Sequence, residues 1–340
     1  MTEKLIVHNA GPGVTVQDLG RPGYLAFGLS RGGAVDPLAL YEGAALLGQA
    51  PECAALELAG MGGAFETTTD TRIALTGAPM KAMIDGVAAA WNASHTLKKG
   101  ARITIGGTLS GSYGYLHVDG GITTPKVLNG RGTHLNAGLG APVQPGNQLP
   151  LGPSKTDGPV GLALPMDPRF DGGTVRLVPS LQTSFFSDAD IDRFQSTTFT
   201  RDTRGNRMGV RLLPPGDGFQ SDAGLNVLSE VIVPGDVQIT GDGTPFVLLC
   251  ECQTTGGYPR IGSVLPADLP KVAQARPGTS LSFQFVSMEE AVAIDLRERD
   301  RRAGLRNAAK PLIRDPATMH DLLSYQLISG MIAGNEETPQ

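Results

Sequence analysis

The segment QTTGGYPRIG, residues 253–262, carries the densest group of residues that could do chemistry. It follows a strongly apolar run, FVLLCEC, so a buried strand should present polar groups at its end. Gly256 and Gly257 permit positive φ angles, at which successive amide N–H groups can converge on an anion, and Thr254 and Thr255 add hydroxyl donors. The segment could therefore hold a carboxylate or a phosphate. A plain Gly-Gly loop with a surface tyrosine explains the same residues equally well.

A second group of candidates lies in the segment GNRMGVRL. Arg207 stands near two glycines there, and a guanidinium in such a setting can bind a carboxylate or a phosphoryl oxygen through two hydrogen bonds. A solvated loop arginine is the alternative. Near the N-terminus, Gln17, Asp18, Arg21 and Arg31 also lie among glycines, just before a predicted helix. Helix N-termini favour anions, although an aspartate at the start of this helix could satisfy the end itself.

The elements that position these residues are mostly strands. Short β-rich segments separated by glycine or proline are typical of sandwiches and barrels rather than of alternating βαβ units. These segments are KLIVHNA, TRIALTG, ARITIGG, GYLHVDGG, TVRLVPS, DVQITGDG, PFVLLCEC and LSFQFVS. Asp85-Gly86 and Asp242-Gly243 predict hairpin turns. The proline-rich stretch from about 150 to 173 is the best linker candidate and divides the chain nearly in half.

Helices are few but clearly signalled. Asp36 can cap a helix over PLALYEGAALLG, and Ser287 with Glu290 forms a capping box before MEEAVAIDLRERDRRAGL. A third helix, with one apolar face, is predicted after Asp315-Pro316. Asp268 is either a general base or the cap of a short helix, LPKVAQ.

Composition limits the function classes. A chain of 340 residues favours two domains. A formal net charge of -5 with scattered Lys and Arg disfavours nucleic acid as a partner. The sequence shows neither a signal-peptide stretch nor a membrane-length apolar run, so we expect a cytoplasmic protein without a membrane partner. The three cysteines and five histidines show no metal-ligand spacing, and Cys250 and Cys252 are expected on one face of a strand as small core residues.

Several segments together resemble a known family. TVQDLGRPGY, NRMGVRL and above all QTTGGYPRI with ADLPKVAQ are similar to the C-type subunit of 5-oxoprolinases. That family is also described as allophanate hydrolase subunit 2, as urea amidolyase-related, or as biotin-dependent carboxyltransferase subdomains A and B. The resemblance spans about residues 5 to 295 and implies a mainly β fold of two tandem cyclophilin-like β-barrel domains with a few short helices. The predicted domains are 1–160 and 174–300, followed by a helical tail at 301–340.

The resemblance also implies a function. The implied function is that of one subunit of an ATP-dependent 5-oxoprolinase, a lactam hydrolase that opens 5-oxo-L-proline to L-glutamate. The other subunits would be a smaller B-type, kinase-inhibitor-like subunit and an A-type subunit. Mg-ATP would be shared with a partner, because the chain has no Walker-type motif. Two alternatives remain open. One is the carboxyltransferase component of a urea carboxylase or urea amidolyase system, which would use biotin; the other is a non-catalytic module that antagonises a kinase-inhibitor-like partner.

The site residues carried over are those at matching motif positions. They are Arg207, Met208, Gln253, Thr254, Thr255, Gly256, Gly257, Tyr258, Pro259 and Asp268. Activating a lactam by phosphorylation needs an anchor for the substrate carboxylate and donors for the developing charge. In this interpretation Arg207 binds an anionic group of the substrate, and the Thr-Thr-Gly-Gly donors bind the oxyanion or phosphate. Gln253 binds an amide edge, and Tyr258 closes the pocket.

The chain departs from the family pattern at two places. Residues 129–133, NGRGT, have fewer hydroxyls than the usual run, and Asn147 stands where an acidic residue is common.

Overall fold

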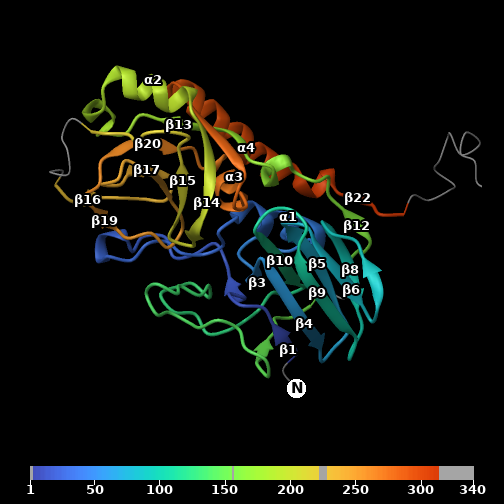
Figure 1. Ribbon diagram of the computed structural model, residues 1–340. Helices are drawn as coiled ribbons and strands as arrows, with labels where there is room; N and C mark the ends of the chain where they lie inside the picture. The colour runs from blue at the N-terminus through green and yellow to red at the C-terminus, as the bar shows by residue number, and fades with distance from the viewer. Residues whose placement is uncertain (1–2, 155–156, 222–227, 314–340) are drawn as a thin grey trace, which may run out of the picture.

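The computed structural model describes residues 3–154, 157–221 and 228–313 (Figure 1). Strands from the first half form two sheets around one core. Their orders are β11-β1-β4-β9-β6-β7 and β2-β3-β10-β5-β8-β12-β22, the last strand coming from the far end of the described chain. The strands are β1 (Lys4–Ala10), β2 (Thr15–Gln17), β3 (Ala55–Ala59), β4 (Met61–Thr67), β5 (Thr71–Gly77), β6 (Met80–Ile84), β7 (Val87–Ala89), β8 (Ala93–Leu97), β9 (Arg102–Thr108), β10 (Tyr113–Val118), β11 (Gln148–Pro150), β12 (Leu162–Ala163) and β22 (Lys310–Pro311).

The second half closes into a barrel with the order β13-β20-β17-β18-β15-β14-β21. A two-stranded ribbon, β16-β19, lies beside it. The strands are β13 (Gly173–Val178), β14 (Thr198–Asn206), β15 (Gly209–Leu213), β16 (Glu230–Val231), β17 (Asp236–Ile239), β18 (Pro245–Leu248), β19 (Thr255–Gly256), β20 (Arg260–Val264) and β21 (Ser280–Phe285). Phe194, Phe199 and Phe283 pack in its core with ring centroids 5.0–5.5 Å apart. The predicted mainly β fold is confirmed.

The described residues contain four α-helices: α1 (Pro37–Leu47), α2 (Asp188–Ser196), α3 (Leu269–Gln274) and α4 (Met288–Ala308). Ser287 caps α4 as predicted, because its hydroxyl accepts from the Glu290 amide. Helix α4 continues past residue 301, where the tail is predicted to begin. The helix predicted after Asp315 lies outside the described residues. No described helix is long and apolar enough to cross a membrane.

Two predicted caps are wrong. Asp36 precedes α1, but its side chain makes no cap; Oδ2 accepts instead from Arg169 Nε and Gln274 Nε2, each at 2.7 Å. Asp268 likewise leaves α3 uncapped, because Arg176 holds both of its carboxylate oxygens. A buried guanidinium forms a stronger hydrogen bond to a carboxylate than a backbone amide does, so the long-range partner wins.

Local turn chemistry was predicted better than strand ends. Asp85-Gly86 joins β6 to β7 with φ of 47° and 82°, and Gly243 turns between β17 and β18 with φ of 76°. The apolar run before the QTTGGYP motif ends earlier than expected. Strand β18 stops at Leu248, so Cys250 and Cys252 lie in the following turn rather than on one strand face. Both cysteines still pack against apolar clusters, as small core residues do.

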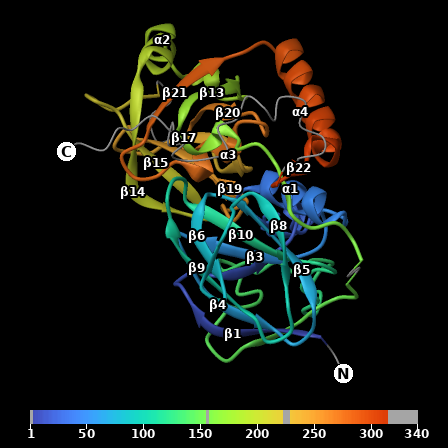
Figure 2. The same ribbon diagram turned by 90° about the vertical axis from the view of Figure 1, so that its right-hand side faces the viewer.

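The two halves are joined by polar side chains and by α4. The Gln274 amide accepts from Ser112 N and Tyr113 N, each at 2.9 Å. Arg169 binds Glu42 of α1 through two hydrogen bonds of 2.7 and 2.8 Å. Figure 2 shows α4 running along one side of the barrel to the first half, where β22 pairs with β12. These contacts fix the boundary at which the site residues meet.

Candidate functional site

Three loop segments meet where the halves join. They are the loop before α1 (residues 18–36), the loop between β10 and β11 (119–147) and the chain after β18 (249–259). Gly32 N donates to Cys250 O at 2.9 Å, and Asn136 N donates to Glu251 Oε2 at 3.0 Å. Figure 1 shows both first-half loops below the β16-β19 ribbon. The structure thus brings the N-terminal and QTTGGYP motifs to one region.

Arg207 lies at the centre of this boundary, but it is not a free cation. Its Nε donates to Glu251 Oε1 at 2.6 Å, its Nη1 to Glu57 Oε1, and its Nη2 to Gly33 O at 2.5 Å. Burial alone would lower the pKa of Arg207, but the two carboxylates outweigh it and hold the pKa well above its ordinary value. The predicted role in binding a substrate anion is therefore not supported by this geometry, because two carboxylates already balance the guanidinium.

Glu57, on β3, is held as firmly as Arg207. Its Oε2 accepts from the Tyr115 hydroxyl at 2.7 Å and from Val35 N at 2.8 Å. Burial and the adjacent Glu57 carboxylate raise the pKa of Tyr115 well above its ordinary value, so this hydroxyl keeps its proton and acts as a donor. We call Arg207, Glu57, Glu251 and Tyr115 the boundary charge cluster. It joins strands of both halves through fully buried hydrogen bonds.

Ser30, His134 and Glu251 lie in a row beside this cluster, yet their hydrogen bonds do not make a nucleophile. Ser30 Oγ is 2.9 Å from His134 Nε2. His134 Nδ1 accepts from Ala137 N at 3.2 Å, so a neutral ring carries its proton on Nε2 and donates it to the serine. Burial lowers the pKa of His134, which favours that neutral ring. The arrangement is structural, because a base would have to accept the serine proton.

The QTTGGYP motif forms the end of the β16-β19 ribbon. Thr255 and Gly256 pair with Val231 and Glu230, and Ile232 N donates to Thr254 O at 3.1 Å. Gly256 therefore lies in a strand, and the predicted anion cradle of positive-φ glycines is not formed in this structure. Three side chains of the motif remain on the surface. These are Gln253, Thr255 and Tyr258, the last 45% exposed.

Close packing, rather than an unusual φ, limits the space for a side chain at position 256. A Cβ there would come within 2.6 Å of Gln238 Nε2 and 2.9 Å of Ile232 Cδ1. Gln238 points away from the barrel core, towards the ribbon, and its Nε2 is buried without a partner. Arg260, directly after the motif, is paired with Glu230 of β16 and Asp236 of β17. The motif is thus anchored to the outer wall of the barrel.

The remaining predicted residues have local roles. Met208 lies in the β14–β15 turn, where its N donates to Asn206 Oδ1 at 2.8 Å. Gly257 continues the ribbon towards Pro259, whose carbonyl accepts from Ile239 N at 2.9 Å. Burial alone would raise the pKa of Asp268, but hydrogen bonds from Arg176 outweigh it and lower the pKa. A carboxylate held in this way is a poor general base.

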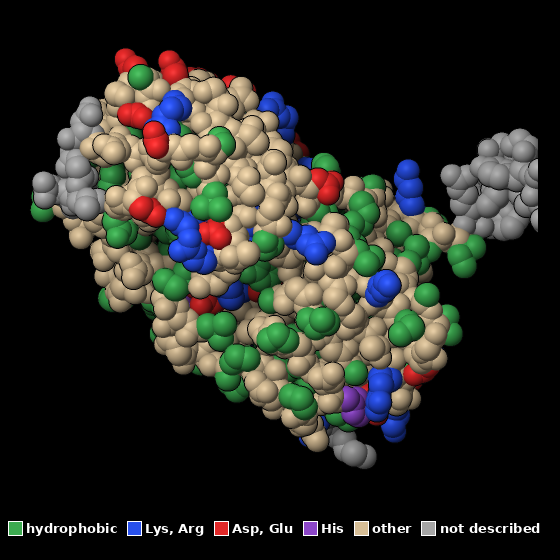
Figure 3. Space-filling view, in the orientation of Figure 1, with side chains coloured by type: hydrophobic (Ala, Val, Ile, Leu, Met, Phe, Trp, Pro, Cys, Tyr) green, Lys and Arg blue, Asp and Glu red, His purple; other side chains and the backbone are tan. Residues whose placement is uncertain are grey.

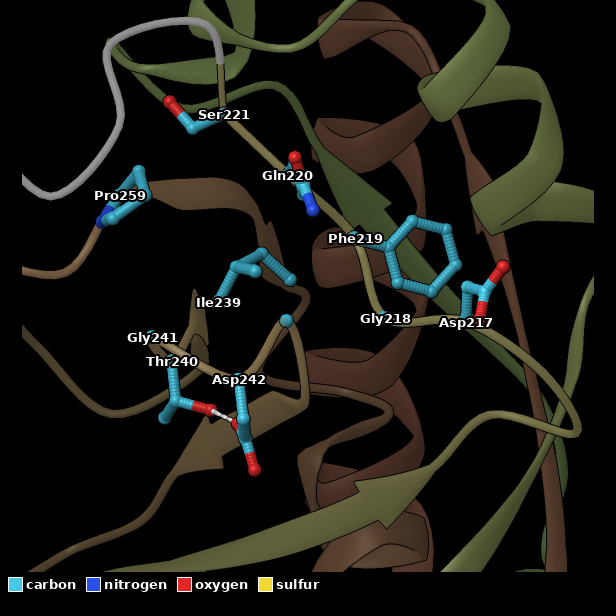
Figure 4. Close-up of a pocket in the computed structure, with 11 residues that line it drawn as sticks. Asp217, Gly218, Phe219, Gln220, Ser221, Ile239, Thr240, Gly241, Asp242 and Pro259 are labelled. Atoms are coloured by element: carbon cyan, nitrogen blue, oxygen red, sulfur yellow. Dashed lines mark hydrogen bonds between the residues drawn. The ribbon is translucent and has the colours of Figure 1, made fainter.

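Two cavities lie in this part of the molecule. Pro259 borders one of about 470 Å³ at the end of the barrel, where Gln220, Ile239, Thr240 and Asp242 surround a shallow polar space (Figure 4). The other, of about 390 Å³, lies between the halves and is lined mainly by apolar residues of α1 and of the chain around Cys250. Figure 3 shows a hollow at this boundary, with charged side chains at its bottom and apolar side chains around it.

Sequence reasoning missed the acidic partners of Arg207. Glu57 stands in an apolar strand, ALELA, and Glu251 lies between two cysteines. Each is a lone charge in an apolar run, and a buried charge needs a partner. That signal could have pointed to an internal ion pair, but not to its arginine, which lies 150 residues from Glu57.

Comparison with known proteins decides the family. The model described as "Carboxyltransferase domain, subdomain A and B" matches residues 27–285. The chain belongs to this family. It is also 35% identical over 292 residues to the 5-oxoprolinase C-type subunit of Escherichia coli, a match that covers 85% of this chain and 93% of that protein. The resemblance found in the sequence is confirmed.

Two further relatives belong to larger proteins. Urea amidolyase of Saccharomyces cerevisiae is 27% identical over 305 residues, which cover 83% of this chain but only 16% of that enzyme. The crystal structure of TTHA0988 superposes with a TM-score of 0.75 and 29% identity, over 84% of this chain. The chain spans 56% of the length of TTHA0988.

Proposed function

We propose that this chain is the C-type subunit of an ATP-dependent 5-oxoprolinase, which opens 5-oxo-L-proline to L-glutamate together with a B-type and an A-type subunit. The match to the E. coli protein carries this proposal, because it extends over 93% of that protein. The urea amidolyase match covers 16% of a much larger enzyme and so concerns a single part of it.

The chemistry requires more than this chain offers. An amide carbonyl is a poor electrophile, and phosphorylation of its oxygen by ATP would activate it. Triphosphate binding needs free cations, yet Arg207 and Arg260 near the motif are each paired with two carboxylates. We therefore propose that a partner subunit supplies most of the phosphate contacts, with Thr254 and Thr255 adding hydroxyl donors.

The exposed end of the QTTGGYP motif would face that partner. Gln253, Thr255 and Tyr258 project from a ribbon that is rigidly anchored by Arg260. Exposed apolar side chains on and just before β16, Val231 at 57% and Leu228 at 85%, suit a protein interface better than a free surface. In this proposal the small B-type subunit lies over the ribbon and excludes water from the lactam.

Reconstitution of the three subunits tests the proposal. We expect glutamate release from 5-oxo-L-proline that requires ATP, all three subunits and the QTTGGYP surface. Thr255→Val with Tyr258→Ala should lower turnover at least ~10-fold, since each removes a contact at the covered surface. Arg102→Lys, an exposed change on β9, serves as the control. A complex that assembles but releases no glutamate with ATP present would contradict the proposal.

The family match also favours a second candidate, the carboxyltransferase step of a urea carboxylase. The matching family model is itself described as a carboxyltransferase domain. This alternative requires a biotinylated carrier, so the same preparation should be tested for binding to one. Carrier binding together with transfer of the carboxyl group from a carboxylated carrier to urea, which leaves free biotin on the carrier, would replace the first proposal.

A further inference from the structure

Three buried polar atoms without a hydrogen bond lie on the loop between β10 and β11 or on side chains that contact it. They are Gln17 Oε1, Arg21 Nη1 and Thr124 Oγ1, three of the seven such atoms among the described residues. Gln17 and Arg21 are 0% and 2% exposed. Each unpaired buried group costs about 1–3 kcal/mol, so three in one region indicate that something else pairs with them.

No carboxylate of the described chain forms a hydrogen bond to the buried guanidinium of Arg21, although Asp18 and Glu251 lie near enough to favour its charge. Its Nε donates to Val127 O at 2.8 Å and its Nη2 to Gly130 O at 3.4 Å, which leaves Nη1 free. The nearby Asp18 is already occupied, because its two oxygens accept from Gly20 N and Arg131 N. Burial lowers the pKa of Arg21. An oxygen atom of a bound ligand would supply the acceptor that Nη1 lacks.

Gln17 offers an unpaired hydrogen-bond acceptor, whereas Arg21 offers an unpaired donor. Its Nε2 donates to Thr15 Oγ1 and to Thr133 O, both at 3.0 Å. A carbonyl can only accept, so this pairing fixes the amide orientation and leaves Oε1 as a free acceptor. The site therefore presents one unused acceptor beside unused donors. Water could satisfy either group, but a ligand with both an oxygen anion and an N–H satisfies both kinds at once.

Two glycines bring the loop backbone close to these side chains. A Cβ at position 130 would lie 2.7 Å from Arg21 Cγ, and one at position 132 would lie 2.8 Å from Gln17 Oε1. The turn above them is closed by reciprocal hydrogen bonds between Val127 and Gly130, of 2.8 and 3.1 Å. Leu128 and Asn129 at its tip have φ of 51° and 65°, which is strained for residues with a side chain.

We propose that Arg21, Gln17 and Thr124 bind the substrate of this chain, a small molecule with a carboxylate and an amide. Arg21 Nη1 and the Thr124 hydroxyl donate to its oxygens, and Gln17 Oε1 accepts from its amide N–H. This inference rests on the proposed function, since 5-oxo-L-proline carries a carboxylate, a lactam N–H and a lactam carbonyl. It assigns substrate recognition to the first half rather than to Arg207, and Asn136 links that region to Glu251, just before the QTTGGYP motif.

Two variants of the reconstituted complex test the inference. Thr124→Val removes a hydroxyl that has no hydrogen-bond partner in the described chain, so the substitution should not lower the stability of the protein. We expect instead a ~10-fold rise in KM for 5-oxo-L-proline, with kcat and thermal midpoint nearly unchanged, as the loss of one hydrogen bond predicts. Arg21→Lys keeps the charge but loses the planar fork, and should raise KM at least as much. Arg102→Lys is again the control.

Binding and exchange give readouts that do not depend on turnover. In the wild type, 5-oxo-L-proline should slow amide hydrogen exchange in residues 125–132, whereas 2-pyrrolidinone, which lacks the carboxylate, should not. Unchanged KM values in both variants of an active complex would overturn this inference and leave the proposed function intact. A complex without ATP-dependent glutamate release contradicts the proposed function. If 5-oxo-L-proline also fails to slow exchange in that loop, both are overturned.

Discussion

Replacing Arg207 with methionine should destabilise the protein rather than only lower its turnover. The substitution leaves Glu57 and Glu251 buried, with side chains 1% and 2% exposed, and without their cation. Each loses a charge-assisted hydrogen bond worth about 1.5–3 kcal/mol, so the pair predicts a loss of about 3–5 kcal/mol in the free energy of unfolding. A typical domain has only about 5–15 kcal/mol in total.

Urea unfolding followed by circular dichroism measures this loss. Arg204→Met, on β14 just before Arg207, is the matched control, because Arg204 is 69% exposed and its ion pair with Asp202 should contribute less than about 1 kcal/mol. Adding Glu57→Gln and Glu251→Gln to the Arg207 variant should restore part of the stability. An Arg207→Met protein with a wild-type unfolding midpoint but turnover ~10²-fold lower would refute the structural role and reinstate Arg207 as a substrate ligand.

Two further predictions concern packing and pH. Gly256→Ala should cost about 1 kcal/mol or less, because the ends of the Gln238 and Ile232 side chains must move to admit its Cβ, whereas Gly216→Ala, with open space around it, should cost nothing; thermal midpoints compare them. Asp268 has a folded-state pKa below its unfolded value, so its contribution is present above pH of about 4 and is lost as pH falls through the folded pKa. Asp268→Asn should therefore show a smaller loss of stability between pH 5 and pH 2, and equal acid sensitivity would contradict the Arg176 pairing.

The sequence predicted those features that depend on neighbouring residues. Short β-rich segments between glycines and prolines identified the strands, Asp85-Gly86 identified a hairpin, and Ser287 identified the start of α4. The predicted caps at Asp36 and Asp268 failed because distant arginines bind those carboxylates more strongly than the adjacent amides do. Local patterns carry no information about such partners.

The same difference between local and long-range features applies to the candidate site. The structure brings the predicted motifs to one region of the fold, since the loops before α1 and after β10 meet the chain that follows β18. The ion pairs of Arg207 could not be predicted from its own segment, because its partner Glu57 lies in a different sheet. Equally, an unpaired atom such as Arg21 Nη1 becomes visible only when every neighbouring acceptor is known.

The boundary charge cluster has a consequence for how this protein can be assembled or divided. Glu57 of the first half pairs with Arg207 of the second half, and Asp36 pairs with Arg169 of the linker. A fragment that contained only one of the halves would therefore hold a charged side chain without its counter-ion. We therefore expect the halves to unfold as one cooperative unit, and grafting either of them onto a relative should succeed only if both sets of countercharges are transplanted with it.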